Sequence, residues 1–363
     1  MKVYISCNGL GLGHVGRSLA YADKLRDRGD EVIFATWGPA VDFAKRNGYK
    51  CYKLPKVNWY DRKDGSLDLM KTTMISPILL TKAFEQSITE NLIIIKEKPD
   101  IIVSDSNFTT NMLANILLIP SIFLTHQITF KQSAEIVNNI FDFFIQMILL
   151  NANKVCINDF RSPDNIYPLS VLKKKKAVYI GPLIRTEPDK MEPRIKNEKK
   201  QCFILISGPK KSPHALEKQI LSIEEDLQNM DDWQFFIVSP SKQKDKDNIK
   251  YVQWLDDIYS YLNTCDVFVS RSGYSTVCDA LAYRKKSIFI PQINQSEQEL
   301  IASNLKNRHL CSTLSQKDIK KLPKLIRKVH KDTDMQNNLN SLNNLFTKFP
   351  GADQMIKVID ELV

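Results

Sequence analysis

A histidine lies within a glycine-rich turn near the amino terminus. The segment CNGLGLGHVGRS (7–18) follows the apolar run KVYIS, which predicts a short buried strand that ends at this turn. His14 would therefore stand between a strand and a helix, where the helix amino terminus favours negative charge. An imidazole so placed can take a proton from a hydroxyl near neutral pH, so we predict a general base. The alternative is a histidine that only caps the helix.

Asp105 is the carboxylate that strengthens the prediction for His14. It ends the apolar run in IIVSD (101–105), which predicts another strand of the same parallel sheet. From there it can accept a bond from one imidazole nitrogen and direct the other nitrogen toward a substrate. Taken alone, Asp105 is more typical of a turn or helix-capping carboxylate.

The same turn formally matches a dinucleotide fingerprint, through the glycines at 11, 13 and 16. That motif needs an acidic residue at the carboxyl end of the second strand, to hold a ribose. Here the second strand ends in FATWG, and its acids, Asp30 and Glu31, lie at the opposite end. The pattern therefore disfavours an NAD or FAD site.

Composition and charge restrict the class of protein. The chain has 363 residues, 43% of them hydrophobic, which indicates a soluble globular protein of two domains. No run of about 18 apolar residues and no signal-peptide pattern occur, so we expect a cytoplasmic location. The seven cysteines have no CxxC spacing and are expected to be reduced. The net charge of +10 suggests an anionic partner, but no aromatic-rich or zinc-knuckle signature points to nucleic acid.

Strands and helices alternate along both halves of the chain, which predicts an α/β fold with two doubly wound parallel sheets. In the first half we expect strands at 2–6, 30–38, 50–55, 99–107, 120–127, 154–159 and 177–185, and helices at 16–29, 39–48, 76–97 and 108–119. In the second half we expect strands at 201–209, 233–240, 249–255, 265–273 and 286–292, and helices at 212–230, 256–263, 274–284 and 296–307.

The predicted domains are 1–184 and 201–340, joined by a polar, basic linker at 185–200. A final amphipathic helix within 341–363 is expected to pack back on the first domain. Residues 133–150 predict a strongly apolar helix, either buried in the core or facing a lipid-linked substrate or the membrane.

The segment 270–304 combines features of a nucleotide site. Ser270 to Gly273 end a strand and open a helix, whose first backbone N–H groups and the Ser275 and Thr276 hydroxyls can bind an anion. Asp279, further along the same helix, can accept hydrogen bonds from two ribose hydroxyls. After the next strand, Gln298 and Glu299 can reach sugar hydroxyls.

These motifs resemble a known family. SRSG, TV, Asp279 and the following IFIP and EQ are similar to the donor site of GT-B glycosyltransferases, especially family 28. That family includes the bacterial enzymes that add N-acetylglucosamine to lipid-linked muramyl pentapeptide. GLGLGHVGRS resembles its amino-terminal loop, and ISGP (206–209) its interdomain loop. An uncharacterised archaeal-type group of the superfamily is similar as well.

The resemblance implies roles for individual residues. Leu255 would bind the uracil base of the nucleotide through its backbone. Asp279 would bind the ribose, and its side chain is one methylene shorter than the family's glutamate. Glu299 stands where the family often has glutamine, and Arg17 where it has proline; we expect Arg17 to face an anionic acceptor such as a lipid phosphate. The other implied donor-site residues are Ser207, Gly208, Arg271, Ser272, Gly273, Ser275, Thr276 and Gln298, and the predicted acceptor side comprises Gly11, Gly13, Arg17, His126 and Gln127.

The sequence thus predicts an inverting glycosyltransferase that needs no metal and no cofactor, and that takes a sugar from a UDP-sugar. The acceptor would be a glycan or a lipid-linked hydroxyl, reached at an anionic membrane surface. Two alternatives stay open: a UDP-sugar epimerase of the same fold, which needs no acceptor, and a non-catalytic protein that only binds nucleotide sugars or glycans.

Overall fold

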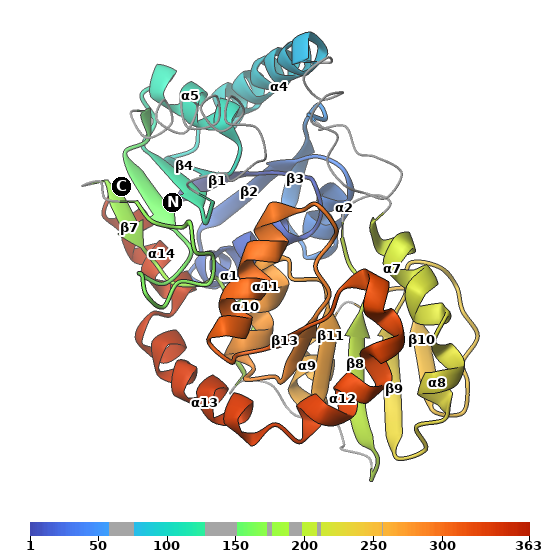
Figure 1. Cartoon of the computed structure of the whole chain (residues 1–363). Coiled ribbons are helices and arrows are strands. Elements are labelled where there is room, and N and C mark those ends of the chain that lie inside the picture. Colours follow the sequence, from blue (N-terminus) through green and yellow to red (C-terminus); the bar gives the residue numbers. More distant parts are fainter. Residues whose placement is uncertain (58–75, 128–150, 173–175, 189–197, 209–211, 256) are drawn as a thin grey trace. The chain divides into compact units, whose positions relative to one another are not determined.

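The computed structural model describes residues 1–57, 76–127, 151–172, 176–188, 198–208, 212–255 and 257–363. These residues form two compact units (Figure 1). Unit 1 contains the amino-terminal part of the chain through Arg185 together with Lys348–Val363, and unit 2 contains Thr186–Thr347. The predicted apolar helix at 133–150 lies outside the described residues.

Unit 1 is built on a parallel sheet of seven strands in the order β3-β2-β1-β4-β5-β6-β7. Strand β1 lies inside the sheet between β2 and β4, and its register pairs Cys7 with Asp105, so both residues lie at the carboxyl edge of the sheet. The strands are β1 (Lys2–Cys7), β2 (Glu31–Thr36), β3 (Lys50–Lys53), β4 (Ile101–Asp105), β5 (Ser121–Thr125), β6 (Lys154–Ile157) and β7 (Ala177–Tyr179).

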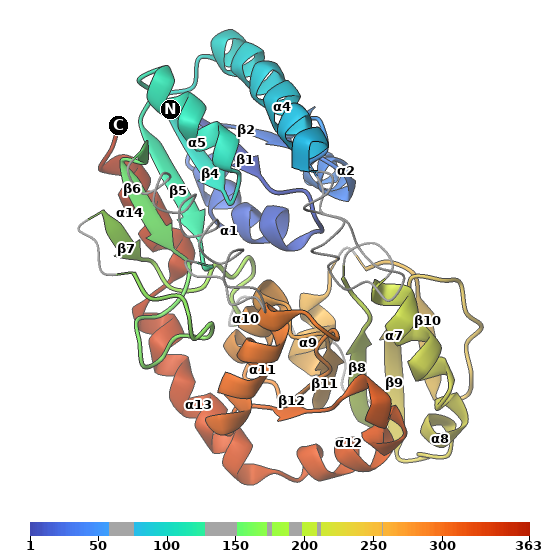
Figure 2. The same ribbon diagram turned by 45° about the horizontal axis from the view of Figure 1, so that its top comes forward.

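Helices cover both faces of this sheet, because alternate residues of its strands point to opposite sides. In β1, Val3 and Ile5 pack with α1 and α14 on one face, whereas Tyr4 packs with α4 and α5 on the other. Figures 1 and 2 show the two helix layers. The helices are α1 (Gly13–Asp27), α2 (Pro39–Arg46), α4 (Ser76–Glu97), α5 (Phe108–Ile116) and α14 (Gly351–Asp360).

The last helix, α14, belongs to unit 1 although it ends the chain. Its apolar side, which includes Met355 and Ile359, joins the same core cluster as α1. Two ion pairs accompany this packing, Lys24 with Asp353 at 2.6 Å and Arg28 with Asp360 at 2.9 Å. The carboxyl terminus of the chain is therefore held against unit 1 by both apolar and ionic contacts.

Unit 2 repeats the design with six parallel strands in the order β10-β9-β8-β11-β12-β13. Its strands are β8 (Lys200–Leu205), β9 (Trp233–Val238), β10 (Ile249–Val252), β11 (Val267–Ser270), β12 (Ser287–Phe289) and β13 (Ser312–Thr313). Its helices are α7 (Ser212–Leu221), α8 (Glu224–Gln228), α9 (Tyr259–Thr264), α10 (Tyr274–Ala282), α11 (Ser296–Asn307), η2 (Gln316–Lys321), α12 (Leu322–His330) and α13 (Thr333–Lys348).

Several local expectations need correction. Helix α1 begins at Gly13 rather than at residue 16, so His14 lies in its first turn and not in a loop. The helix expected over 212–230 is two helices, α7 and α8. Helices α12 and α13, which fill the segment between β13 and α14, were not predicted. All seven cysteines are free, as expected, and only Cys51 is not fully buried.

Candidate functional site

The turn after β1 is shaped by a close approach of two loops. A Cβ atom on Gly9 would lie 2.2 Å from the carbonyl oxygen of Trp37, which follows β2, so only glycine fits there. The chain then enters α1 directly at Gly13. This packing brings the first turn of α1, with His14, to the carboxyl edge of the sheet, where β4 also ends.

Asp105, the last residue of β4, is fully buried at this edge. Its backbone carbonyl accepts a bond of 3.1 Å from the N–H of Asn8, which fixes it beside the turn. Its Oδ1 lies 2.9 Å from Nδ1 of His14, and its Oδ2 accepts a bond of 3.2 Å from the Ser18 hydroxyl. The structure therefore brings His14 and Asp105 together, and adds Ser18, which sequence analysis missed.

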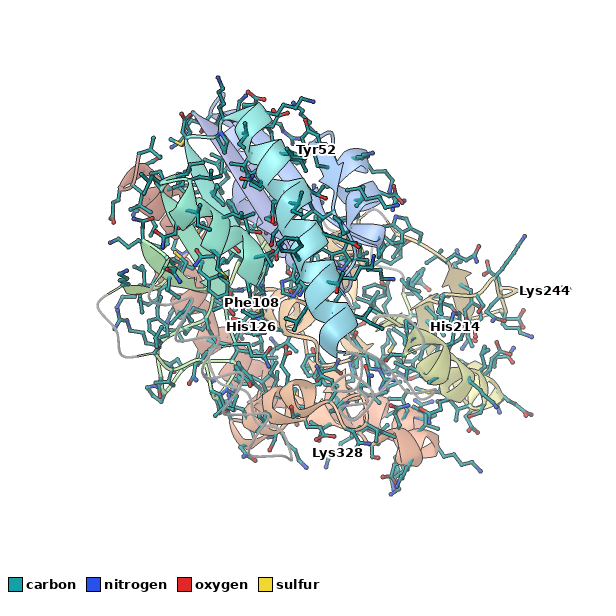
Figure 3. The ribbon with its side chains drawn as sticks, turned by 90° about the horizontal axis from the view of Figure 1, so that it is seen from above. Tyr52, Phe108, His126, His214, Lys244 and Lys328 are labelled. Carbon is teal, nitrogen blue, oxygen red and sulfur yellow. The ribbon has the colours of Figure 1, made fainter. Side chains whose placement is uncertain are left out.

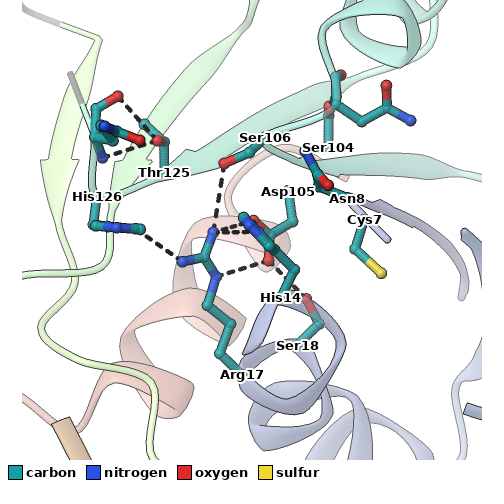
Figure 4. Close-up of polar contacts among 12 residues, drawn as sticks. Cys7, Asn8, His14, Arg17, Ser18, Ser104, Asp105, Ser106, Thr125 and His126 are labelled. Carbon is teal, nitrogen blue, oxygen red and sulfur yellow. Dashed lines mark hydrogen bonds and ion pairs between the residues drawn. The ribbon is translucent and has the colours of Figure 1, made fainter. Parts of the chain in front are cut away.

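Arg17 is the second missed partner of Asp105 (Figure 4). Its Nε donates to Oδ2 at 2.8 Å, and its Nη2 donates to Oδ1, so the guanidinium grips the carboxylate with two bonds. Burial would raise the pKa of Asp105, but the charges of Arg17 and His14 and their hydrogen bonds hold that pKa well below its usual range. Asp105 is thus an ionised carboxylate at neutral pH.

The expectation that Arg17 faces an anionic acceptor is wrong. Its side chain is 3% exposed, and its guanidinium forms an ion pair with Asp105. The reason is the early start of α1: Arg17 stands one turn after His14 on the same helix, so both side chains point at Asp105.

His126, which follows β5, also joins this cluster. Its Nδ1 lies 2.9 Å from Nη1 of Arg17, and it is 6% exposed. Of the other residues predicted for the acceptor side, Gln127 is partly exposed and its N–H donates to the Thr125 hydroxyl at 3.1 Å. Gly11 is partly exposed and Gly13 is exposed. The side chain of His14 is 24% exposed, which makes it the accessible ionisable group of the cluster.

In unit 2, the predicted anion site lies at the start of α10. Gly273 precedes the helix in an extended conformation, and Ser275 and Thr276 are partly exposed in its first turn. The expected contribution of the Ser272 hydroxyl is wrong, because that group is buried and donates to the carbonyl oxygen of Gln298 at 2.9 Å. The predicted anion site otherwise consists of backbone N–H groups and the partly exposed hydroxyls of Ser275 and Thr276.

Arg271 is also used inside the protein, contrary to the prediction that it binds the nucleotide sugar. It is 2% exposed, and Nη1 donates to the carbonyl oxygens of Ile290 and Pro291 and to Oε1 of Gln316. Burial without an acidic partner lowers the pKa of Arg271 to about 10. Arg271 therefore ties the end of β12 to η2.

Asp279 is different, because its carboxylate makes no hydrogen bond to the residues that the structure describes. It is partly buried on α10, and this burial raises its pKa to about 8. A carboxylate that is desolvated but not paired is suited to hydroxyl groups of a ligand.

Of the other predicted donor-site residues, Gln298 and Glu299 lie in the first turn of α11, whereas Ser207, Gly208 and Leu255 lie in the segments that follow β8 and β10. Gln298 is 7% exposed, and its Oε1 accepts the N–H of Gln292 at 3.0 Å. Glu299 is exposed, and its Oε1 accepts the N–H of Asn294 at 3.2 Å. Ser207 and Leu255 are partly exposed. Gly208 is exposed with a φ of +141°, a conformation that favours glycine.

No three His, Cys, Asp or Glu side chains within the described ranges are grouped so that they could hold a metal ion. No helix in the same ranges is both long enough and apolar enough to cross a membrane.

Comparison with known proteins finds similarity to glycosyltransferases. Residues 204–355 match the model of the glycosyltransferase family 28 C-terminal domain. An uncharacterized glycosyltransferase of Methanosarcina acetivorans is 25% identical over 99% of this chain and 98% of its own length. The UDP-N-acetylglucosamine–N-acetylmuramyl-(pentapeptide) pyrophosphoryl-undecaprenol N-acetylglucosamine transferase of a Sulfurihydrogenibium species is 22% identical over 100% of this chain and 98% of that protein.

Solved structures show the same fold. The glycotransferase of kitacinnamycin has a TM-score of 0.73 at 15% identity, over 100% of this chain and 99% of that one. The spinosyn rhamnosyltransferase SpnG complexed with thymidine diphosphate has a TM-score of 0.67 at 13% identity, over 99% and 100%. The predicted architecture of two Rossmann-like domains, the GT-B fold, is confirmed.

Proposed function

We propose that this chain, a GT-B glycosyltransferase with a family 28 C-terminal domain, moves a sugar from a UDP-sugar to an acceptor hydroxyl, with His14 as the base. The observation that carries the proposal is the anchoring of His14. Its Nδ1 lies 2.9 Å from the buried carboxylate of Asp105, while the side chain remains 24% exposed. Nε2 is thereby left as the ring nitrogen that can meet a substrate.

The proposed reaction is one displacement with inversion at the anomeric carbon. Nε2 of His14 takes the proton of the acceptor hydroxyl as its oxygen forms a bond to the anomeric carbon. The bond from that carbon to the diphosphate oxygen breaks, and UDP leaves with the electron pair. Asp105 stabilises the imidazolium that forms.

The donor would be held by unit 2. The backbone N–H groups at the start of α10 and the hydroxyls of Ser275 and Thr276 would meet the charge that develops on the diphosphate. In this proposal no metal is required, which turnover in the presence of a chelator would test. Asp279 would accept hydrogen bonds from the ribose hydroxyls, and the backbone of Leu255 would bind the uracil ring. The choice of uridine is supported by the printed name of the Sulfurihydrogenibium relative, whose donor is a UDP-sugar.

The test compares His14→Ala with the wild type and with His309→Ala. His309 is a half-exposed histidine of unit 2 that faces Asp332, so its variant controls for loss of an imidazole. We expect His14→Ala to bind UDP normally in calorimetry and to lose about 10²–10⁴-fold in transfer from UDP-hexoses to a panel of glycan and polyprenyl-linked acceptors. Unchanged transfer by His14→Ala would refute the base assignment. Conversion of the donor sugar without acceptor would indicate an epimerase instead, and UDP binding with no turnover of any donor a binding protein.

We further propose a lipid-linked acceptor that is met at an anionic membrane surface on the cytoplasmic side. Exposed apolar side chains on the outer sides of α4 and α5 support this. Figure 3 looks down on α4, the long cyan helix at the centre of the view. These side chains, each about half exposed or more, are Ile78, Leu80, Phe84, Ile88, Leu92 and Ile95 on α4 and Met112, Ile116 and Leu118 on or just after α5.

Four of the α4 residues, at 84, 88, 92 and 95, follow helical spacing and form one stripe. Contiguous exposed apolar surface of this kind marks an interaction site, and the net charge of +10 favours an anionic partner. Flotation with phosphatidylglycerol vesicles at low salt tests the proposal. We expect wild-type protein to float and the double variant Phe84→Ser, Leu92→Ser to stay at the bottom, with Val171→Ser as a matched control of similar exposure outside the stripe. Failure of the wild type to float would contradict it.

A further inference from the structure

Arg17 contacts several polar groups besides its ion-pair partner Asp105. Beyond its two bonds to Asp105, Nη1 lies 2.9 Å from Nδ1 of His126, and Nη2 lies 2.9 Å from Nδ1 of His14. Nη2 is also 3.5 Å from the hydroxyl of Ser106. One buried guanidinium thus touches a carboxylate, two imidazoles and a hydroxyl (Figure 4).

The contact between Arg17 and His126 is compatible with one tautomer of His126. A guanidinium can donate hydrogen bonds but cannot accept them. Nδ1 of His126 must therefore accept, which means that His126 is neutral and carries its proton on Nε2. The ring is also held from the side, because the ring of Tyr167 meets it edge-on with 6.0 Å between centroids. Tyr167 is in turn fixed by its N–H, which donates to the buried carboxylate of Asp159 at 2.9 Å.

The contacts of His14 exclude one another. If Nδ1 of His14 carries a proton, it donates to Oδ1 of Asp105, and the 2.9 Å contact with Nη2 of Arg17 cannot be a hydrogen bond. If Nδ1 is unprotonated, it accepts from Nη2, and the proton sits on Nε2. Only the first form leaves Nε2 free to take a proton from a substrate.

We propose that Arg17 is a positioning residue, and that neutral His126 holds its guanidinium in place. When His14 becomes the base, one N–H of Arg17 Nη2 changes its hydrogen-bond acceptor from Nδ1 of His14 to the hydroxyl of Ser106. This rests on the proposed function of His14. In the resting form Nη2 donates to His14. In the active form Nδ1–H of His14 donates to Asp105, and the released N–H of Nη2 finds the Ser106 hydroxyl. Throughout, Nε stays on Asp105 and Nη1 stays on His126, so the carboxylate keeps its orientation.

This arrangement explains why the arginine is buried beside the base. A lysine at 17 would bring the same charge, but one ammonium cannot hold both oxygens of Asp105 and also reach His126. A neutral residue would leave Asp105 with His14 and Ser18 only. The fork geometry of arginine is therefore what the site requires, and not its charge alone.

The first test needs no variant and no substrate. In ¹⁵N-histidine-labelled wild-type protein at neutral pH, imidazole nitrogens with and without a proton have well-separated ¹⁵N shifts. We expect His126 as the neutral Nε2–H form, and His14 as a population that includes the Nδ1–H form. A cationic His126, or one protonated on Nδ1, would overturn the proposal.

The second test uses Arg17→Lys, Ser106→Ala and a control, Arg28→Lys, which alters an exposed arginine at the end of α1. We expect Arg17→Lys to lower kcat by about 10²-fold through misplacement of His14, with the KM for the donor and UDP binding unchanged. Ser106→Ala should lower kcat less, and Arg28→Lys not at all. Unchanged kcat in Arg17→Lys would contradict the proposal.

A different result would be expected if the proposed role of His14 as the base were wrong. If His14→Ala turned over normally, His14 would not be the base, yet His126 would still show the Nε2–H form, because that result depends on Arg17 alone. The tautomer measurement thus separates the two ideas.

Discussion

Units 1 and 2 share a strand order, but the charged residue that ends or follows the fourth strand differs between them, and so do its partners. In unit 1, β4 pairs with β1, the first strand of that unit, and ends at Asp105; in unit 2, β11 pairs with β8, the first strand of that unit, and leads into Arg271. Asp105 accepts two hydrogen bonds from a buried guanidinium, whereas Arg271 has no acidic partner among the described residues and donates to two carbonyl oxygens and an amide oxygen.

The difference shows how one fold can prepare two kinds of site. Unit 1 completes its charge pairing within the protein, so that an oriented imidazole is ready before any substrate binds. Unit 2 uses its arginine inside the protein, and in the proposed function the backbone N–H groups of α10 and Asp279, which has no hydrogen bond to the described residues, would bind the ligand. Variants of these carboxylates and of Arg271 should therefore behave differently.

The largest effect is expected for Asp105→Asn. This change leaves the guanidinium of Arg17 buried without its charge partner, which costs about 3–5 kcal/mol in the free energy of unfolding. Denaturant unfolding at neutral pH measures it. Because the pKa of Asp105 is lowered in the folded protein, its contribution is present at neutral pH and is lost only as the pH falls below the usual aspartate range. The matched control, Asp360→Asn, removes an exposed pair with Arg28 and should cost under about 1 kcal/mol. Equal losses in both variants would contradict the buried pair.

The next effect concerns Asp279→Asn and is expected in binding. Hydrogen bonds to a charged group contribute about 1.5–3 kcal/mol, so UDP should bind about 10–100-fold more weakly. Since burial raises the pKa of Asp279 to about 8, the carboxylate becomes ionised as the pH rises from 6 to 8. The affinity advantage of the wild type over the variant should therefore grow across that range. Calorimetry of both proteins at each pH cancels the titration of UDP itself, and a constant difference would argue against Asp279 as a nucleotide ligand.

Arg271→Met should affect stability more than binding. It leaves the carbonyl oxygens of Ile290 and Pro291 and the amide of Gln316 without their donor, which costs about 1–3 kcal/mol. Arg327→Met, at an exposed pair with Asp232, is the control. We expect unchanged UDP affinity in calorimetry. A large loss of affinity with intact stability would restore the original prediction that Arg271 contacts the nucleotide.

The smallest effect on stability is expected for Glu299→Gln. Glu299 is exposed and accepts only the N–H of Asn294, so its replacement should change the free energy of unfolding by about 0.5 kcal/mol or less. UDP affinity should not change, but the preference among UDP-hexoses should, because an amide can donate to a sugar hydroxyl and a carboxylate cannot. An unchanged preference would remove Glu299 from the donor site.

The juxtaposition of His14 and Asp105 could be predicted from the sequence alone. Alternating apolar runs such as that of β1 and β4 indicate parallel strands, and the carboxyl ends of parallel strands share one edge of a sheet. The helix α10 and the position of Asp279 on it could be predicted in the same way, from local pattern and strand direction. The donor role of both was inferred from motif resemblance and stays a prediction.

Which polar groups the protein keeps for itself was decided by the tertiary structure. Arg17, Arg271 and Ser272 all looked available to ligands, yet each is buried against a partner far away in the chain. The start of α1 three residues earlier than expected turned Arg17 inward. Arg271 is bonded to η2 and to the residues after β12, and Ser272 is bonded to a carbonyl oxygen of α11. Local sequence determines where a side chain enters the fold, but its partners come from elements distant in sequence, and only the packed structure shows which hydrogen bonds are already made.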